Sequence, residues 1–248
     1  MSENKLISVI IPCFQQAGTI VKDLKRIQKV LTQIRYPYEI IVVVDGKTDQ
    51  TFSRIKPLAS SQLKVYLNKI RQGKGYSVRY GMTKAKGDYI AFLDAGMEID
   101  PNGISMLLEH LEWYNADIIV GSKRHLASVV KYPWDRKILS WGYYFLVRLL
   151  FGVKIKDTQP GIKIFKRQVL QKILPKLLVK NYAFDIEMLS VAHRKGFTRI
   201  YEAPIKLKHR FGSVTDAATL NTIWHMLYDT IAVFYRLKIL KFYDSKTR

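Results

Sequence analysis

The stretch from Glu39 to Asp45 reads Glu-Ile-Ile-Val-Val-Val-Asp, and it decides the fold. Its β-branched residues predict a buried strand, and the chain turns directly after it at Asp45-Gly46. A similar strand is expected before it at Leu6–Ile11, and another after it at Leu63–Leu67. Apolar residues at helical spacing from Ile20 to Ile34 predict a helix between the first two strands.

The alternation of strands and helices continues along the first half of the chain. Further strands are predicted at Tyr89–Leu93 and Ile118–Val120, and helices at Gly75–Ala85 and Ile104–Leu111, with a short helix capped by Asp49. Strands separated by such helices predict an α/β fold with a mostly parallel sheet and helices on both faces. We expect one domain over residues 1–215, followed by an amphipathic C-terminal helix and a basic tail over 216–248.

Composition limits the classes of partner. The 248 residues hold 41 Lys and Arg against 20 Asp and Glu, a formal charge of +21, which predicts an anionic partner such as nucleic acid, an acidic membrane or a phosphorylated substrate. The single cysteine, Cys13, excludes an intramolecular disulfide and a cysteine-based zinc site, and it suggests a reducing compartment. No run reaches the roughly 20 apolar residues that span a bilayer, and the N-terminus does not resemble a signal peptide.

The residues directly after the strands are the first candidates for chemistry, because parallel sheets bind ligands at the carboxyl ends of their strands. Asp94 follows a predicted strand, and Glu98 comes four residues later. Mg²⁺ or Mn²⁺ is usually held by one or two carboxylates together with substrate phosphates, so this pair is a candidate metal site. A turn-capping Asp94 and a solvated Glu98 explain the spacing equally well.

Three further turns suggest a nucleotide. Pro12–Gln16 and Asp45–Asp49 each join a strand to a helix, and either turn offers groups that could grip a base. The alternative is an ordinary turn with a helix cap, which suits Asp49 better than Asp45. The segment Asn68–Gly75 is glycine-punctuated and opens a helix, so it is a candidate phosphate cradle, although it lacks the spacing of a P-loop.

Together these segments are similar to those of one family. The carrying segments are Val9–Phe14, Glu39–Gly46, Gly73–Gly75 with Val78–Met82, Gly87–Ala95, Val120–Arg124, Asp157–Gly161 with Ile164-Phe165, and Tyr182–Leu189. In these the chain resembles the family-2 glycosyltransferases of the polyprenyl-phosphate type, which include dolichol-phosphate mannose and dolichol-phosphate glucose synthases. The match runs in order from about residue 6 to 213, and the segments Asp157–Gln159 and Ala183–Glu187 look most like the glucose-transferring branch.

The resemblance implies a GT-A (Rossmann-like) fold, a nucleotide-sugar donor, Mg²⁺ or Mn²⁺, and a polyprenyl or dolichyl phosphate acceptor. It assigns the metal to Asp94 and Glu98, and the acceptor phosphate to Arg124 and Arg136, with Asp157 orienting groups nearby. The residues expected to bind the donor nucleotide are Pro12, Phe14, Gln16, Asp45, Arg71, Lys74, Asp94, Ala95 and Arg210, the last closing over the diphosphate.

Several positions depart from the family pattern. Gly96 stands where the family's Asp-x-Asp signature has its second aspartate, which puts metal affinity and activity in question. The first turn reads Phe14-Gln15-Gln16 in place of Tyr-Asn-Glu, Val44 and Lys47 replace Asp and Ser in the second turn, and a late Ser-Lys reads Ser213-Val214. A relative that binds a nucleotide sugar without turnover therefore stays an alternative.

Chemistry and charge predict how such an enzyme works. A phosphate monoester is already an oxyanion at pH 7, so no strong general base is needed, and direct attack on the anomeric carbon inverts its configuration. The aromatic, basic segment Trp134–Phe151 suits a helix lying on a membrane. In the C-terminal helix, Ile223, Leu227, Ile231 and Phe234 are expected to share one apolar face, and His225, Asp229 and Arg236 another.

We therefore expect a peripheral protein on the cytoplasmic face of a membrane, without a transmembrane helix and with an anionic membrane surface as partner. A nucleic-acid-binding protein is the rival reading of the +21 charge, but the basic residues are spread along the chain and no RNA- or DNA-binding motif is present, so no nucleic-acid partner is expected. The sequence leaves open the sugar, the nucleotide, the lipid and the oligomeric state.

Overall fold

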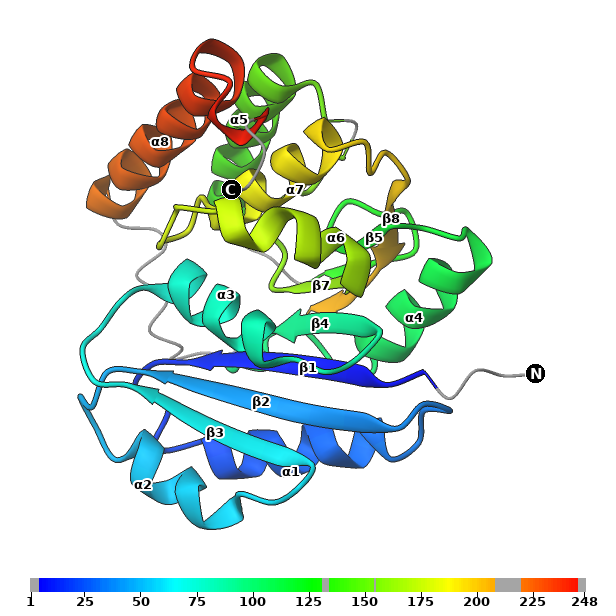
Figure 1. Cartoon of the computed structure of the whole chain (residues 1–248), viewed down its shortest axis with the longest axis vertical. Coiled ribbons are helices and arrows are strands. Elements are labelled where there is room, and N and C mark those ends of the chain that lie inside the picture. The colour runs from blue at the N-terminus through cyan, green and yellow to red at the C-terminus, as the bar shows by residue number, and fades with distance from the viewer. Residues whose placement is uncertain (1–4, 131–133, 154, 208–219, 245–248) are drawn as a thin grey trace.

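A computed structural model describes residues 5–130, 134–153, 155–207 and 220–244, and the side chains of residues 134–139 and 220 lie outside that description. Its centre is a seven-stranded sheet in the order β3-β2-β1-β4-β7-β5-β8 (Figure 1). The strands are β1 Ile7–Cys13, β2 Tyr38–Asp45, β3 Leu63–Asn68, β4 Tyr89–Leu93, β5 Ile118–Ser122, β7 Ile162–Lys166 and β8 Ile200–Pro204, with a small separate pair of β6 Val129–Val130 and β9 Lys206–Leu207.

The helices follow the predicted alternation closely in the first half. They are α1 Ile20–Leu31, α2 Thr51–Ile55, α3 Lys74–Lys84, α4 Gly103–Trp113, α5 Trp134–Phe151, α6 Arg167–Ile173, α7 Phe184–Arg194 and α8 Leu220–Phe234, with short turns η1 Lys56–Leu58, η2 Leu174–Lys176, η4 Tyr235–Ile239 and η5 Phe242–Asp244. The prediction of an α/β fold with a mostly parallel sheet is confirmed. Near the end of the sheet, Ile205 separates β8 from β9.

One strand of the sheet runs against the others. β1 pairs in parallel with β2 and β4, whereas β7 pairs antiparallel with both β4 and β5. β7 was not predicted, because two lysines interrupt the apolar residues of its sequence Ile-Lys-Ile-Phe-Lys. Lys163 is nevertheless fully buried, because Asp185 provides it with an ion-pair partner inside the protein.

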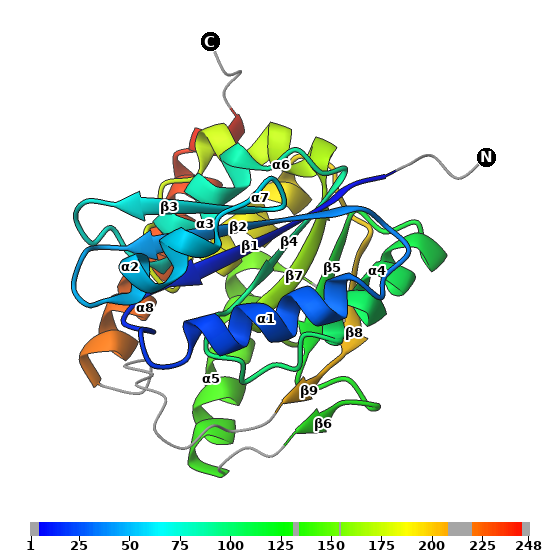
Figure 2. The same cartoon turned by 90° about the horizontal axis from the view of Figure 1, so that it is seen from below.

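Helices cover both faces of the sheet, as Figure 2 shows. Successive side chains of a strand point to opposite faces, so Val9 and Ile11 of β1 join one core cluster and Ile10 joins the other. The first cluster is shared with α1, α2 and α4, and the second with α3, α6 and α7. This double burial explains why the strands of the first half are almost continuously apolar.

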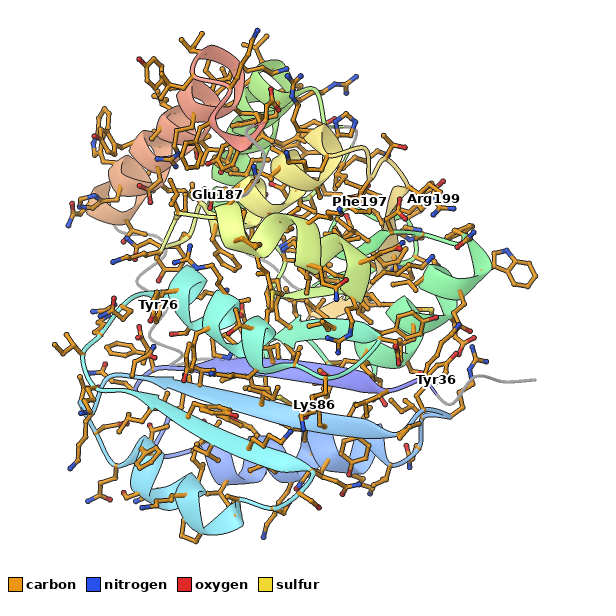
Figure 3. The ribbon with its side chains drawn as sticks, viewed as in Figure 1. Tyr36, Tyr76, Lys86, Glu187, Phe197 and Arg199 are labelled. Atoms are coloured by element: carbon orange, nitrogen blue, oxygen red, sulfur yellow. The ribbon has the colours of Figure 1, made fainter. Side chains whose placement is uncertain are left out.

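The helices α5 and α8 lie on the outer side of the helix layer that contains α7 (Figure 1). The Tyr143 hydroxyl of α5 lies 3.0 Å from the Thr230 hydroxyl of α8, and the rings of Phe151 and Phe234 meet edge to face. The segment after α8 is tied to α7 by the buried Glu187, labelled in Figure 3, which accepts a 2.6 Å hydrogen bond from the Tyr243 hydroxyl. The expected division at residue 215 lies outside the described residues.

Candidate functional site

The segments that follow β1, β2, β3 and β4 meet at one edge of the sheet. The parallel register aligns Cys13 with Val44 and Asp45 with Asn68, so these strands end at the same level. Figure 3 labels Tyr76 near this carboxyl edge, and Tyr36 and Arg199 at the opposite end of the sheet. The structure therefore brings the turns that the sequence singled out into one region.

Asp45 holds a loop in shape. Its buried carboxylate accepts hydrogen bonds from the Asn68 side chain at 3.0 Å, from the Gln72 amide at 2.9 Å and from the Gly73 amide at 2.8 Å. Three of the roughly four lone-pair positions of the carboxylate are thus used within the chain. Asp45 fixes the path of residues 68–73, and one of its lone-pair positions has no partner among the residues that the structure describes.

An aromatic ring and a guanidinium face each other beside this loop. The Arg71 guanidinium carbon lies 4.1 Å from the centre of the Phe14 ring, within the range of a cation–π contact. Gly46, whose φ is +93°, lies beneath it, and a Cβ there would be 3.3 Å from the Arg71 backbone nitrogen. A side chain of the neighbouring loop therefore covers one face of the Phe14 ring.

The other two residues of the first turn have local structural roles. The Gln16 amide donates to the Thr51 hydroxyl at 2.8 Å, and the Gln16 carbonyl accepts from the Ile20 amide at the start of α1. Pro12 is half-buried near the end of β1. Asp49 accepts from the Thr51 amide at 2.9 Å, but the N-cap position of α2 is Gln50, so Asp49 lies one residue before the predicted cap.

The glycines of the expected phosphate cradle are explained by packing. A Cβ at Gly73 would lie 2.5 Å from the Lys180 carbonyl oxygen, and one at Gly75 would lie 2.6 Å from Cβ of Phe184. The Tyr76 amide in the first turn of α3 donates to the Lys180 carbonyl at 3.1 Å. The glycines thus let α3 approach the segment before α7 closely.

Asp94 is the carboxylate at the centre of the site. It follows β4, its amide donates to the Gly161 carbonyl at 2.9 Å, and its Oδ2 pairs with the Lys74 ammonium at 2.7 Å. Its Oδ1 is buried without a hydrogen-bond partner among the described residues. Burial opposes a charge on Lys74, but Asp94 and Asp185 outweigh that effect and raise the pKa of Lys74 above its ordinary value. The next residue, Ala95, is buried.

The donor set fits a hard divalent cation in part. A buried carboxylate oxygen without a partner is costly, and a cation would satisfy Oδ1 of Asp94. Gly96 supplies no ligand, and Glu98 is half-buried four residues after Asp94. Within the ranges that the structure describes, no group of three or more His, Cys, Asp or Glu side chains could hold a metal. Asp94 therefore fits a cation that takes its other ligands from a bound diphosphate.

A buried ion pair behind Asp94 was not predicted from the sequence. The fully buried Lys163 donates to Asp185 at 2.6 Å and to the Pro160 carbonyl at 2.8 Å, and its ammonium lies 5.0 Å from the centre of the Phe92 ring. Burial raises the pKa of Asp185 and lowers that of Lys163. The pair fixes the loop that carries Gly161. In the sequence, the signal for this ion pair is a lysine, Lys163, within an apolar segment.

Arg124 and Asp157 anchor the start of the second half. The Arg124 guanidinium donates to the Ser140 carbonyl at 2.5 Å, to the Ser140 hydroxyl at 2.9 Å and to the Lys156 carbonyl, and it lies over the ring of Trp141. Burial lowers the pKa of Arg124. The buried Asp157 accepts from the Lys123 amide at 2.9 Å.

Two predicted site residues cannot be located. Arg136 belongs to α5, but its side chain lies outside the described residues, and Arg210 lies outside them altogether. Cys13 is buried, and burial raises the pKa of its thiol, so it has no nucleophilic character at neutral pH.

The family model for glycosyl transferase family 2 matches residues 8–174, which include every element from β1 to α6 and the Asp94 site. The chain belongs to glycosyltransferase family 2. This confirms the family resemblance found in the sequence.

Two curated relatives of this family-2 chain carry the same name. A dolichyl-phosphate beta-glucosyltransferase of Dictyostelium discoideum is 31% identical over 207 residues, which are 77% of the chain and 63% of the relative. One of Saccharomyces cerevisiae is 31% identical over 234 residues, 85% of the chain and 69% of the relative. The match to the first relative thus spans less than two thirds of its length.

A solved structure supports the same fold. The glucosyl-3-phosphoglycerate synthase of Mycobacterium tuberculosis, determined with Mn²⁺, UDP and glucosyl-3-phosphoglycerate, superposes with a TM-score of 0.66 at 18% identity, covering 93% of the chain and 79% of that structure. At this identity the likeness concerns the fold, which is the expected GT-A arrangement.

Proposed function

We propose that this family-2 chain transfers a hexose, and glucose in particular, from a nucleotide sugar to a polyprenyl or dolichyl phosphate, with inversion at the anomeric carbon. The 31% identity to two dolichyl-phosphate beta-glucosyltransferases carries this proposal. The local geometry supports it, because the half-buried Asp94 stands at the carboxyl edge of β4 and one of its oxygens has no partner within the described ranges.

The donor nucleotide is assigned to the edge formed by β1, β2 and the loop that Asp45 holds. Its base is proposed to stack on the Phe14 ring and to displace Arg71. The guanidinium carbon of Arg71 lies 4.1 Å from the centre of that ring and so occupies the space over it. Asp45 has one lone-pair position left after three internal hydrogen bonds. One position matches the single ring N–H that uracil presents, whereas guanine presents two neighbouring donors. The site therefore favours UDP-glucose over GDP-mannose.

Asp94, together with Glu98 and the donor diphosphate, is the proposed holder of Mg²⁺ or Mn²⁺. When bound, such a cation offsets the negative charge that builds up on the departing nucleoside diphosphate. The chain's own contribution is to aim the Asp94 carboxylate, which the Gly161 carbonyl fixes through the Asp94 amide. Lys74 and Arg71 add positive charge on the same side.

The acceptor phosphate needs no general base from the protein. Its oxyanion forms the new bond to the anomeric carbon while the bond from that carbon to the donor diphosphate breaks, and the diphosphate leaves with the electron pair. Asp185 is the nearby carboxylate that could have served as a base, but it is buried and paired with Lys163 at 2.6 Å. Arg124 and Arg136, at β5 and α5, are the proposed phosphate ligands.

The exposed faces of α5 and α8 are the proposed contact with the membrane that holds the lipid acceptor. On α5 the exposed large apolar residues are Trp141, Phe145 and Leu149, and on α8 and η4 they are Trp224, Tyr228, Ile231, Tyr235 and Ile239. The predicted C-terminal apolar face differs: Leu227 and Phe234 pack on the core, while Ile231 is exposed. Aromatic residues beside basic ones suit a membrane interface. None of the helices within the described ranges is long and apolar enough to span a bilayer.

Two experiments test these assignments. Calorimetric titration with Mn²⁺ present is expected to detect binding of UDP-glucose and not of GDP-mannose, and the opposite preference would overturn the donor assignment. We expect less protein to sediment with vesicles containing anionic lipid when Trp224 and Tyr228 are both changed to Ala. The control is Trp113→Ala, because Trp113 is even more exposed but lies on α4. If Trp113→Ala lowers the amount of sedimented protein as much as the double variant does, α8 is excluded as the contact.

A further inference from the structure

Lys74 occupies a place in which this enzyme needs a cation. It is the first residue of α3, and its ammonium lies 2.7 Å from Oδ2 of Asp94. About a quarter of the Lys74 side chain and two fifths of that of Asp94 are exposed, so the pair is shielded from solvent in part. A screened surface pair contributes little, but partial burial strengthens this one.

Asp94 is the main counter-ion available to Lys74. Asp185 is near enough to influence Lys74, but its own short ion pair is with Lys163. The ring of Phe184 lies 5.9 Å from the Lys74 ammonium and adds a weak cation–π contact. Lys74 therefore neutralises the one carboxylate left in the family's metal-binding signature, whose second position is Gly96.

We propose that Lys74 is the resident counter-cation of Asp94, and that it moves to the donor diphosphate when donor and metal arrive. This rests on the proposed function. A divalent cation alone meets an aspartate whose charge is already offset, and it gains no second carboxylate from position 96. A diphosphate changes both conditions, because it draws the ammonium away from Asp94 and supplies oxygen ligands of its own.

The side chain and its position suit such a transfer. A lysine carries a compact charge on a flexible four-carbon stem, so it can exchange one anion for another without moving the helix. The helix itself is held in place by the close packing of Gly73 and Gly75 against residues 180–184. The consequence is reciprocal: the nucleotide tightens metal binding, and the metal tightens nucleotide binding by the same factor.

The test is calorimetric titration of Mn²⁺ into the protein with and without saturating UDP. In the wild type, UDP is expected to tighten Mn²⁺ binding at least tenfold. Lys74→Met removes the ammonium, so Mn²⁺ alone is expected to bind about tenfold more tightly than to the wild type, and UDP to add little further. Lys74→Arg keeps the charge and is expected to behave like the wild type. Lys69→Met removes an exposed charge from the same loop and serves as the control.

The outcomes separate the two proposals. If UDP and Mn²⁺ bind the wild type independently, or if Lys74→Met leaves the affinity for Mn²⁺ alone unchanged, the role of Lys74 is refuted while the donor assignment stands. If UDP does not bind the wild type even with Mn²⁺, both proposals fall. If Lys69→Met tightens Mn²⁺ binding as much as Lys74→Met, the effect comes from net charge and not from the ion pair. The wild-type titration keeps the proposal refutable even if Lys74→Met does not fold.

Discussion

The carboxylate of Asp94 packs directly against Gly161, and a Cβ at position 161 would overlap Oδ2 of Asp94. The carbonyl oxygen of Gly161 also accepts a 2.9 Å hydrogen bond from the Asp94 amide. Two segments far apart in the sequence therefore define the position of one carboxylate. The loop Asp157–Gly161 is thus part of the proposed metal site, although it supplies no ligand to it.

Gly161→Ala is expected to displace the Asp94 side chain and to weaken Mn²⁺-dependent UDP binding at least tenfold. The fold should survive, because the new methyl group meets the movable side chain of Asp94 first. Calorimetry with UDP and Mn²⁺ measures the effect, and circular dichroism checks the fold. Gly18→Ala is the control, since a Cβ there has nothing within 4 Å. Unchanged UDP binding in Gly161→Ala would mean that Asp94 is not at the diphosphate.

Gly96→Asp is expected to tighten Mn²⁺ binding by restoring the second carboxylate of the family signature. The position has room for it, because a Cβ at Gly96 has no atom within 4 Å and the backbone there is not in the left-handed region. Titration of Mn²⁺ in the absence of nucleotide measures the gain. Gly96→Asn, of similar size but uncharged, should give a smaller gain. If Gly96→Asp binds Mn²⁺ no better than the wild type, position 96 is not at the metal.

Arg124→Ala is expected to lower kcat/KM for the lipid phosphate by roughly 30- to 1,000-fold, as for loss of a desolvated charge pair worth about 2–4 kcal/mol. Donor binding should stay nearly intact. Because Arg124 also ties β5 to Ser140 of α5, we expect a lower free energy of unfolding as well, which urea denaturation measures. Lys25→Ala, which removes an exposed charge from α1, is the control. Equal transfer rates in Arg124→Ala and the wild type would refute the acceptor role.

The stability of the sheet should depend on pH through Glu39. Burial would raise its pKa, but hydrogen bonds from Lys64, Ser8 and the Lys86 amide to the ionised form lower the pKa of Glu39 from its ordinary value. A carboxylate with a lowered pKa stabilises the fold above its unfolded pKa, and that contribution is lost as the pH falls through the folded value.

Glu39→Gln is therefore expected to cost about 1.5–3 kcal/mol of unfolding free energy at pH 7, and progressively less below about pH 4.5. Urea denaturation at several pH values measures this. Glu109→Gln, which loses an exposed ion pair with Arg35, should cost less than about 1 kcal/mol. A cost for Glu39→Gln that does not change with pH would contradict the assigned ion pair.

The sequence was sufficient for most of the architecture. The apolar strands around Ile40 and the helical spacing after Ile20 depend on local periodicity, and the structure confirms both. β7 was not predicted because its lysines interrupt the apolar pattern of the strand. Lys163 can be buried because Asp185, which is distant in the sequence, forms an ion pair with it. The C-terminal helix was expected, but which of its faces meets the core depends on α5 and could not be derived from the helix alone.

The candidate site could be predicted as positions and not as contacts. Strand ends locate Asp45, Asp94 and Arg124 at one edge, because parallel strands share their direction. What each side chain touches depends on loops far away in the sequence. Asp45 binds the amides of the loop before α3, and Arg124 reaches α5. The ion pair of Lys74 with Asp94 could not be anticipated for the same reason.

The proposed reaction is tested most directly by transfer of label from UDP-[¹⁴C]glucose to dolichyl phosphate by the purified chain with Mn²⁺, counted in the organic extract. We expect labelled lipid from the wild type, none from Asp94→Asn, and little or none when GDP-[¹⁴C]mannose is the donor. Wild-type transfer rates in Asp94→Asn would contradict the site assignment. Absence of labelled lipid with the wild type, although UDP-glucose binds, would contradict the central claim and favour a relative that binds the donor without turnover.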